Sequence, residues 1–483
     1  MRKNRNLLIG SFIFISFIIL LVFSMNTSFL YPDYYSESGL SYSASTLLIS
    51  KGLSQGLIPY KDLFGINGPI IYFLESIGYF FGQGKIVVFI LQVICLSISL
   101  TFTYKILILF IQEKKSYILT CLMLIPIVAT FGEGNSVEEF CLPLIMISLY
   151  IIINYIKNNK LQDFPTKYSL ILGINIGIIC FIRFNNVFPI LGGVVALIIL
   201  NKNNRISNIL YIALGILAVF ICCFTFYFVN DAVQDMIYGT FIYNSKTMLE
   251  GFSTINEIVR KVIKCLPVIA LLLSGFIYER KSDKDMGRVF SLIALFSMIG
   301  SITGTGQWHY YIVIVPFLPI AVAIIMSLDK NILMSIFKYV LLVGLIAIYI
   351  IPFKSTIMSV YDVNTNKKYI ANNKVMTDWA NENLKKDEDI VLVDVPTSFY
   401  LLNNIMPKTR LFSNQSQLSK VDYDIAKEIQ DYVYSTPTTK MIVGTKGWID
   451  ETIGKYVFVD YIGDIADTNL VIYSTEQKHS HNH

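Results

Sequence analysis

Long apolar segments recur along this chain from Leu7 to about Pro352, and the loops between them alternate between Lys/Arg-rich and nearly Lys/Arg-free. A helix needs roughly 17 to 25 apolar residues to cross a hydrocarbon core of about 30 Å. Short loops rich in Lys and Arg stay on the cytoplasmic side of the membrane. The pattern therefore predicts a polytopic α-helical membrane protein whose sidedness can be assigned from its loops.

Composition agrees with a protein that lives in a lipid bilayer. Hydrophobic residues make up 54% of the chain and charged residues 15%, which is more apolar than a typical soluble domain. All seven cysteines fall within apolar segments without CxxC spacing, so we expect neither disulfides nor structural zinc. The net charge of +5 comes mostly from basic residues at membrane edges, and we expect no nucleic-acid partner.

The alternation of loops gives about eleven transmembrane helices. The first apolar run, Leu7–Phe23, follows a basic start without a small-residue cleavage site, which indicates a retained helix with a cytoplasmic amino terminus. Residues 25–84 form a predicted first external loop with interfacial helices, including the amphipathic stretch Ser43–Leu57 and the interrupted stretch Ile66–Phe81. Further external turns are expected at residues 131–138, 183–186, 230–258 and 304–309.

A change of composition at residue 354 predicts a small water-soluble α/β domain after the membrane domain of residues 1–353. An odd number of spans places this domain outside the cell. Its predicted helices are Met376–Leu384 and Tyr423–Val433, and its predicted strands are Ile390–Val395, Met441–Val443 and Leu470–Tyr473. The domain ends near residue 474, and the tail 475–483 carries three histidines that could bind a metal only weakly.

Polar groups collect at the predicted external face, although loops far apart in the sequence contribute them. Charges at membrane depth are costly and persist mainly where they act. The members are Asp33, Glu37, Asp62, Glu133, Glu138, Glu139, Arg183, Asn185, Asn186, Lys246 and His309. Each has a structural alternative when taken alone, such as a helix cap for Asp33 or an interfacial charge for Arg183. Together they predict a convergent external site.

Several short motifs on this face resemble a known family. The stretches Tyr35–Gly39, Gly56–Phe64 and Asn67–Tyr72 are similar, in this order, to the first external loop of bacterial GT-C glycosyltransferases, the relatives of protein O-mannosyltransferases. Further patches agree, namely Gly134–Phe140, Ile182–Asn186 and Trp308–Tyr311. The resemblance covers about residues 7–330 and implies a GT-C-like membrane fold.

The resemblance implies an enzyme of the plasma membrane that moves a sugar from a polyprenyl-phosphate carrier to an extracytoplasmic acceptor, with inversion. The acceptor would be a cell-wall polymer, a capsule or lipid-linked glycan, or a protein. Such a donor needs no nucleotide, because its lipid holds it in the bilayer. The reaction needs a carboxylate that accepts the proton of the attacking hydroxyl, and cationic groups that hold the departing lipid phosphate.

The roles of individual residues follow from the family motifs. Glu37 takes the place of the first-loop base, which is usually aspartate, and Asp33 is the alternative one helical turn earlier. Arg183 is the first candidate for the lipid phosphate because its planar fork matches phosphate oxygens, followed by His309, Lys246 and Arg260. Candidates for sugar or acceptor contacts are Glu138, Glu139, Asn185, Asn186, Tyr60, Asp62 and Tyr310. No cofactor is required by the motifs, and a divalent metal shared by the first-loop acid with Glu138 or Glu139 stays open.

Other classes of function remain alternatives. A transporter or lipid flippase would also have about a dozen helices, although its charges usually lie near the bilayer midplane in broken helices of repeated halves. A polysaccharide polymerase for lipid-linked glycans would carry a large external loop with arginines, whereas the loop at residues 230–258 is short and contains Lys246. A binding or scaffolding protein without activity is the remaining alternative.

Overall fold

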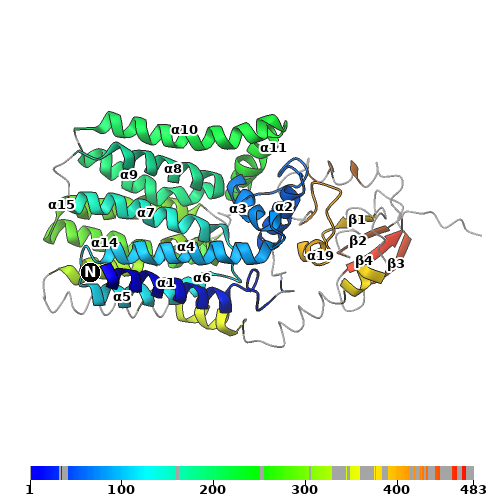
Figure 1. Cartoon of the computed structure of the whole chain (residues 1–483), viewed down its shortest axis with the longest axis horizontal. Helices are drawn as coiled ribbons and strands as arrows, with labels where there is room; N and C mark the ends of the chain where they lie inside the picture. Colours follow the sequence, from blue (N-terminus) through cyan, green and yellow to red (C-terminus); the bar gives the residue numbers. More distant parts are fainter. Residues whose placement is uncertain are drawn as a thin grey trace, which may run out of the picture.

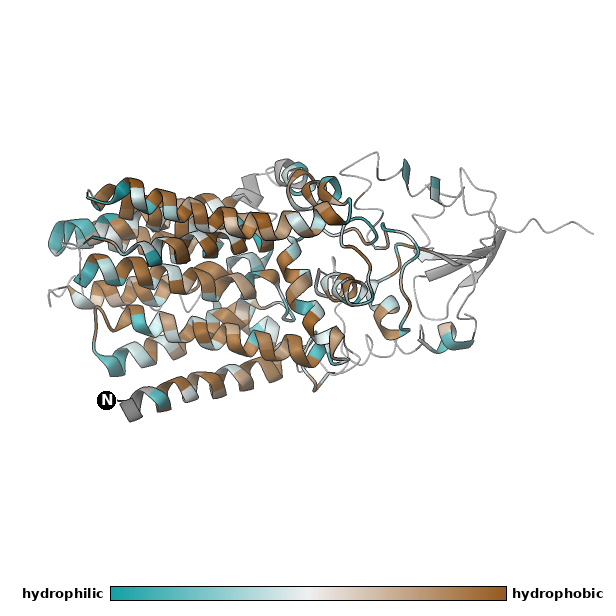
Figure 2. Cartoon of the chain, turned by 45° about the horizontal axis from the view of Figure 1, so that its top comes forward, coloured by the Kyte–Doolittle hydropathy of each residue, from teal (hydrophilic) through white to brown (hydrophobic). Residues whose placement is uncertain are grey.

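A helical bundle with a small β-sheet beyond one end makes up the computed structural model (Figure 1). It describes residues 2–31, 34, 42–158, 163–201, 203–250, 255–303, 306–328, 344, 349–358, 360, 375, 377–382, 390–413, 415, 418, 425, 427–428, 431–432, 441–445, 460–464 and 470–474. The helices of the bundle are apolar along most of their length, and hydrophilic residues concentrate near their ends (Figure 2).

Long apolar helices build the bundle. They are α1 (Arg2–Phe23), α4 (Gly84–Leu107), α7 (Val137–Asn158), α8 (Thr166–Arg183), α9 (Phe188–Leu200), α10 (Arg205–Val229), α14 (Leu266–Lys281), α15 (Lys284–Ile302) and α16 (Phe317–Ser327), with the shorter α5 (Glu113–Leu122) and α6 (Leu124–Thr130). Among the described residues, 7 segments are long and apolar enough to cross a membrane. The chain is therefore a multi-pass membrane protein, as its loops predict.

The difference between 7 segments and about eleven predicted spans has identifiable causes. Helices α5, α6 and α14 have only 10, 7 and 16 residues, because the chain is interrupted at Met123 and at Cys265. Helices α8 and α9 are counted as one segment of 35 residues. The last predicted span, which ends near Ile351, lies largely outside the described residues. The exact number of spans stays a prediction.

Helices α8 and α9 run in opposite directions on either side of the predicted external turn at residues 183–186. Asn175 of α8 donates to Ser148 of α7 at 2.9 Å, and Arg183 at the end of α8 pairs with Glu138 at the start of α7. Helix α8 therefore runs antiparallel to α7. Helix α9 returns along α7, where its middle packs against Ile152. The turn between them is a 3-10 helix, η1 (Phe184–Val187).

The predicted external loops meet at one end of the bundle, which we call the external end. Hydrogen bonds join them across the sequence: Asn26 Nδ2 to Glu133 O at 3.1 Å, Gly68 N to Ile182 O at 3.0 Å, Lys61 Nζ to Asn230 O at 2.8 Å, and Asn185 Nδ2 to Thr303 O at 3.2 Å. The β-sheet lies beyond this same end (Figure 1). The structure thus groups the loops as predicted, while their orientation to the cytoplasm stays a prediction.

Two glycines allow close backbone contacts, one between the first external loop and α8 and one between α8 and α10. A Cβ atom on Gly68 would overlap the carbonyl of Phe181, so only glycine permits the first loop to bond the end of α8. Likewise, a Cβ atom on Gly173 of α8 would overlap the carbonyl of Ile212 of α10. Small residues let membrane helices approach closely, and they do so here between α8 and α10.

The first external loop contains two helices that pack against each other. Its helices are α2 (Tyr42–Ser54) and α3 (Pro69–Phe80), and α3 starts with proline at its first position, where no N–H is needed. We expected the stretch Ser43–Leu57 to lie along the membrane surface. Leu47, Leu48 and Ser50 of α2 are fully buried, and α3 covers the helix on one side. The place of this stretch relative to the membrane surface stays a prediction.

Short helices complete the external end. They are α11 (Val233–Ile237), the π-helix η2 (Tyr238–Ile242), α12 (Tyr243–Glu250), α13 (Ile255–Lys264) and the 3-10 helix η3 (Trp308–Ile314). All of them fall in the predicted external loops at residues 230–258 and 304–309 or directly after these loops.

Beyond this end lies a four-stranded sheet of order β1-β2-β4-β3. The strands are β1 (Ile390–Val393), β2 (Met441–Thr445), β3 (Asp460–Asp464) and β4 (Leu470–Ser474), and α19 (Thr397–Leu402) follows β1. β1 runs parallel to β2, whereas β4 is antiparallel to β2 and β3. Three strands lie where the sequence predicts them. β3 was not predicted, because its two aspartates and one glycine hide its β pattern. The division into domains stays a prediction.

Candidate functional site

A buried ion pair lies at the external end, where α7 begins and α8 ends. Arg183 Nε lies 3.0 Å from Oε1 of Glu138, and the side chains are 22% and 0% exposed. Apart from this pair, neither oxygen of Glu138 accepts a hydrogen bond from the described residues. A buried carboxylate requires a counter-charge, and the partly exposed guanidinium supplies it. Glu138 also lies in the first turn of α7, where the helix dipole favours a negative charge.

Helix η3 brings aromatic side chains onto this ion pair. The guanidinium carbon of Arg183 lies 4.0 Å from the ring centre of Tyr310, within the range of a cation–π interaction. The ring of His309 stands edge-on to that of Tyr310, with centroids 4.4 Å apart. His309 is in turn close enough to Glu138 and Arg183 to interact with their charges. Arg183, Glu138, His309 and Tyr310 therefore form one cluster, which we call the Arg183 cluster.

A small polar cavity adjoins the Arg183 cluster. Its lining includes Arg183, Asn185, Asn186 and Tyr310, and its volume of about 20 Å³ holds about one water molecule. The side-chain nitrogen of Asn186 is buried and has no hydrogen-bond partner among the described residues. The cavity is too small for a sugar ring. A headgroup would therefore have to meet the exposed part of Arg183.

A further cation near this cluster was not predicted from the sequence. Lys264 at the end of α13 donates to the carbonyl of Gly306, and its ammonium lies 4.6 Å from the ring centre of Trp308. Burial, and secondarily the positive charge of Arg260, lower the pKa of Lys264. Lys264 also interacts with His309. The basic residues of α13 recur at helical spacing, which is the signal that could have identified it.

A second buried acid, which is not among the predicted site residues, lies behind the first external loop. Glu75 of α3 is 1% exposed. It accepts hydrogen bonds from Asn135 at 2.9 Å, Ser50 at 3.0 Å and Thr46 at 3.2 Å. Burial raises the pKa of Glu75 to about 7, against the effect of these donors. An acid within an apolar run was the available signal. The cluster joins α2 and α3 to the turn that precedes Glu138.

Replacing Glu75 by glutamine is expected to remove a pH-dependent part of the stability. The folded protein holds this proton up to a pH of about 7, whereas the unfolded chain releases it near 4.5. The free energy of unfolding should therefore fall by about 3 kcal/mol as the pH rises through this window, and Glu75→Gln should abolish that fall. Apparent Tm values at pH 5 and pH 8 measure the effect. The exposed Glu113→Gln is the control, and an equal pH slope in Glu75→Gln and the natural protein would contradict the expectation.

Glu139, a candidate for sugar contact, has both oxygens engaged by the protein. Oε2 accepts from Gln92 at 2.6 Å, and Oε1 accepts from the backbone N–H of Ser136 at 2.8 Å. The second bond is that of a capping box, in which the third helical residue satisfies the N–H of the cap residue. Glu139 therefore has a structural role at the start of α7, next to Glu138.

Tyr60 and Asp62, two further candidates, shape the first external loop from within. Tyr60 is fully buried, and its hydroxyl donates to the carbonyl of Asn67. Its ring packs against those of Tyr72 and Tyr227, with centroids 5.7 and 5.6 Å away. Asp62 accepts from the N–H of Ile58 at 2.6 Å, which closes the turn. These contacts give both side chains a structural role within the first external loop.

The remaining candidates lie apart from the cluster or outside the described residues. Lys246 lies on α12 with its ammonium 5.5 Å from the ring centre of Tyr238. Arg260 is exposed on α13. Glu37 and Asp33 lie outside the described residues. In the part of the chain that the structure describes, no group of three or more His, Cys, Asp or Glu side chains could hold a metal ion. The roles of all these residues stay predictions.

Comparisons with known proteins agree with this architecture. Residues 12–335 match the family model described as "Putative competence-induced protein Ccs4 N-terminal domain". ArnT from Cupriavidus metallidurans in the apo state is similar over 97% of both chains, at 11% identity and a TM-score of 0.58. Its complex with undecaprenyl phosphate matches at 9% identity over 97% of this chain and 98% of that chain, with a TM-score of 0.58.

A second solved structure is also similar. The apo oligosaccharyltransferase from Archaeoglobus fulgidus matches over 98% of this chain and 75% of that chain, at 11% identity and a TM-score of 0.53. A search of curated proteins finds no significant match. At these identities the likeness concerns the fold, which is the GT-C fold that the first-loop motifs predicted.

Proposed function

We propose that this chain, which belongs to the Ccs4 N-terminal domain family and has the GT-C fold, is a membrane glycosyltransferase. Its donor is a sugar carried on a polyprenyl phosphate, and its acceptor is an extracytoplasmic glycan or protein. The solved complex of ArnT with undecaprenyl phosphate supports this donor class, because it shows that a protein of the same fold binds a polyprenyl phosphate.

The Arg183 cluster is the observation that carries the proposal. A polyprenyl-phosphate donor presents a phosphate at the membrane surface, and the negative charge on this phosphate grows as the sugar leaves. Arg183 is oriented by Glu138 and by the ring of Tyr310, at the end of a membrane helix. A preorganised cation in this place stabilises the departing phosphate without reorganising during the reaction. Lys264 and His309 add donors on the same side.

The acid that activates the acceptor comes from the first external loop in this proposal. Glu37 accepts the proton of the attacking hydroxyl, and Asp33 is the alternative. Attack from the face opposite the phosphate inverts the anomeric centre. The first loop bonds the end of α8 directly, through Gly68 N and Ile182 O, so the loop and Arg183 belong to one frame. This bond supports a common site for both groups.

Incubating the purified protein with a panel of polyprenyl-phosphate sugars tests the proposal. We expect release of free polyprenyl phosphate that depends on an acceptor, and no turnover of nucleotide sugars. Turnover of a soluble nucleotide sugar would contradict the donor class. Movement of intact lipid-linked glycan across proteoliposomes, without transfer, would indicate a flippase instead.

A further inference from the structure

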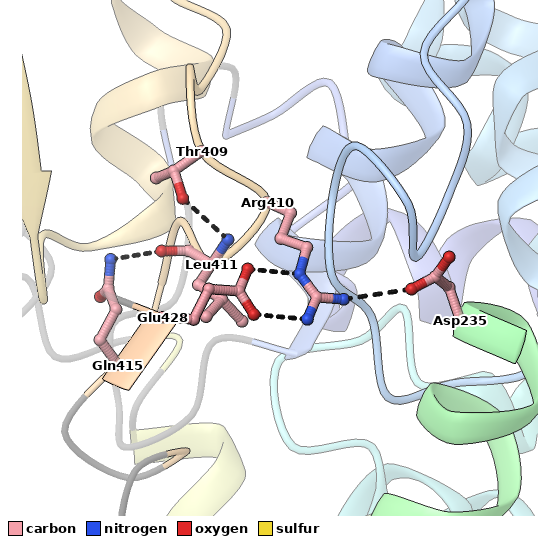
Figure 3. A network of polar contacts seen from close by, with 6 residues as sticks. All are labelled: Asp235, Thr409, Arg410, Leu411, Gln415 and Glu428. Carbon is pink, nitrogen blue, oxygen red and sulfur yellow. Dashed lines mark hydrogen bonds and ion pairs between the residues drawn. The ribbon is translucent and has the colours of Figure 1, made fainter. Parts of the chain in front are cut away.

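The chain that follows the β1 strand docks onto the external end of the bundle, with Arg410 at the centre of the contact (Figure 3). Nε and Nη2 of Arg410 both donate to the carboxylate of Glu428, which makes a bidentate pair. Nη1 donates to Oδ1 of Asp235 on α11 at 3.3 Å. Arg410 thus joins two parts of the chain that are far apart in the sequence.

The backbone of Arg410 contacts the first external loop at the same point. The N–H of Phe64 donates to the carbonyl of Arg410 at 2.7 Å. The ring of Phe64 belongs to a buried apolar cluster with Tyr243 of α12 and with Leu411, Leu418 and Ile425 of the docked chain. Through backbone, charge and apolar contact, Arg410 and its neighbours therefore hold the first loop against α11 and α12.

Two further contacts tie the docked chain to α2. The hydroxyls of Ser45 and Thr397 lie 3.2 Å apart, and Lys51 donates to the side chain of Asn404 at 2.6 Å. The docked chain is itself braced, because the hydroxyl of Tyr400 donates to the carbonyl of Phe412 at 3.1 Å. The contacts therefore extend along α2 as well as at Phe64.

We propose that Arg410 is a positioning residue of the transfer site, which rests on the proposed function. It holds α2 and the Phe64 turn in the arrangement that the reaction needs. The same loop bonds the end of α8 through Gly68 N and Ile182 O, one residue from Arg183, so the placement of this loop bears directly on the proposed phosphate site. Fixing a loop in advance removes the entropy that ordering it would cost at each turnover.

The exposure and geometry of the ion pairs of Arg410 support a positioning role over a purely stabilising one. The side chains of Arg410, Asp235 and Glu428 are 28%, 34% and 36% exposed, so water screens the pairs and their effect on global stability is small. The bidentate geometry nevertheless fixes the direction of the guanidinium. Hydrogen bonding to Glu428 also raises the pKa of Arg410.

The test compares Arg410→Ala with Arg288→Ala in the full-length protein. Arg288 pairs with Glu279 at 3.1 Å at the opposite end of the bundle, which makes it a matched control. Arg410→Ala should raise the amide exchange of the peptide around Phe64 about 10-fold and lower kcat about 10-fold with little change in KM. Arg410→Lys should restore part of both, because lysine keeps the charge but not the fork. Arg288→Ala should alter neither.

The exchange measurement separates this proposal from the proposed function. Faster exchange in Arg410→Ala without any transferase activity in the natural protein would sustain the docking and overturn the function. Equal transfer activity in Arg410→Ala and in the natural protein would overturn the positioning role. Should Arg410→Ala fail to fold, the full chain with Ser45→Cys and Thr397→Cys gives a second test. Formation of the disulfide supports the docking, and its absence under oxidising conditions contradicts it.

Discussion

Replacing Glu37 by glutamine is expected to lower kcat for sugar transfer by about 10²–10⁴-fold, because a general base contributes that much to such reactions. Glutamine keeps the size and hydrogen-bonding capacity of the side chain but cannot accept the proton. KM for the donor should change little, since the phosphate contacts remain. Transfer rates with a saturating polyprenyl-phosphate sugar measure the loss.

Asp33→Asn is the matched control for this change. If Glu37 is the base, Asp33→Asn should reduce the rate far less than Glu37→Gln. The reverse order would assign the base to Asp33. Full activity in both variants of an enzyme with demonstrated transfer would place the base elsewhere, and Glu138 would then be the next acid to test.

Loss of Arg183 is expected to lower kcat about 10²–10³-fold, the range found when a preorganised donor to a developing charge is removed. Arg183→Ala alone would leave the buried Glu138 carboxylate unpaired, and such a charge destabilises a protein by about 3–5 kcal/mol. The double variant Arg183→Gln with Glu138→Gln avoids this problem, because it removes both charges and keeps similar volumes. Single-turnover transfer and binding of undecaprenyl phosphate should both be measured.

Arg205→Ala, which removes a partly exposed arginine at the start of α10, is the control for Arg183. It should leave transfer unchanged. Unaltered undecaprenyl-phosphate binding and transfer in the double variant would contradict a phosphate role for Arg183. Glu138→Gln alone is expected to show an intermediate effect, because the guanidinium stays but loses the carboxylate that helps to orient it.

The sequence predicts the membrane part of this fold well, because the length of an apolar run and the charge of its flanking loops act locally. The turn at residues 183–186 illustrates this, since two apolar runs separated by a few polar residues leave little room for another topology. The chain reverses direction at this turn, between α8 and α9. The grouping of Arg183, Glu138, Asn185, Asn186 and Tyr310 at one end follows from the same alternation.

Features that depend on contacts between distant segments could not be predicted from the sequence. The hydrogen bonds of Glu75 come from α2 and from the turn before α7, and no local pattern brings these together. The same holds for Lys264, whose position depends on how α13 packs beside η3. Tyr60 lies in a motif of the first loop, but a motif cannot tell a sugar-facing ring from a buried one.

The bond between Gly68 and Ile182 restricts how the proposed site can admit its substrates. A hinge that separated the first external loop from the tip of α8 would have to break this contact, in which the missing Cβ leaves no space to slide. The part of the first loop around Gly68 and the tip of α8 therefore move together. In the proposed enzyme, entry of the donor must then rely on movement of other elements.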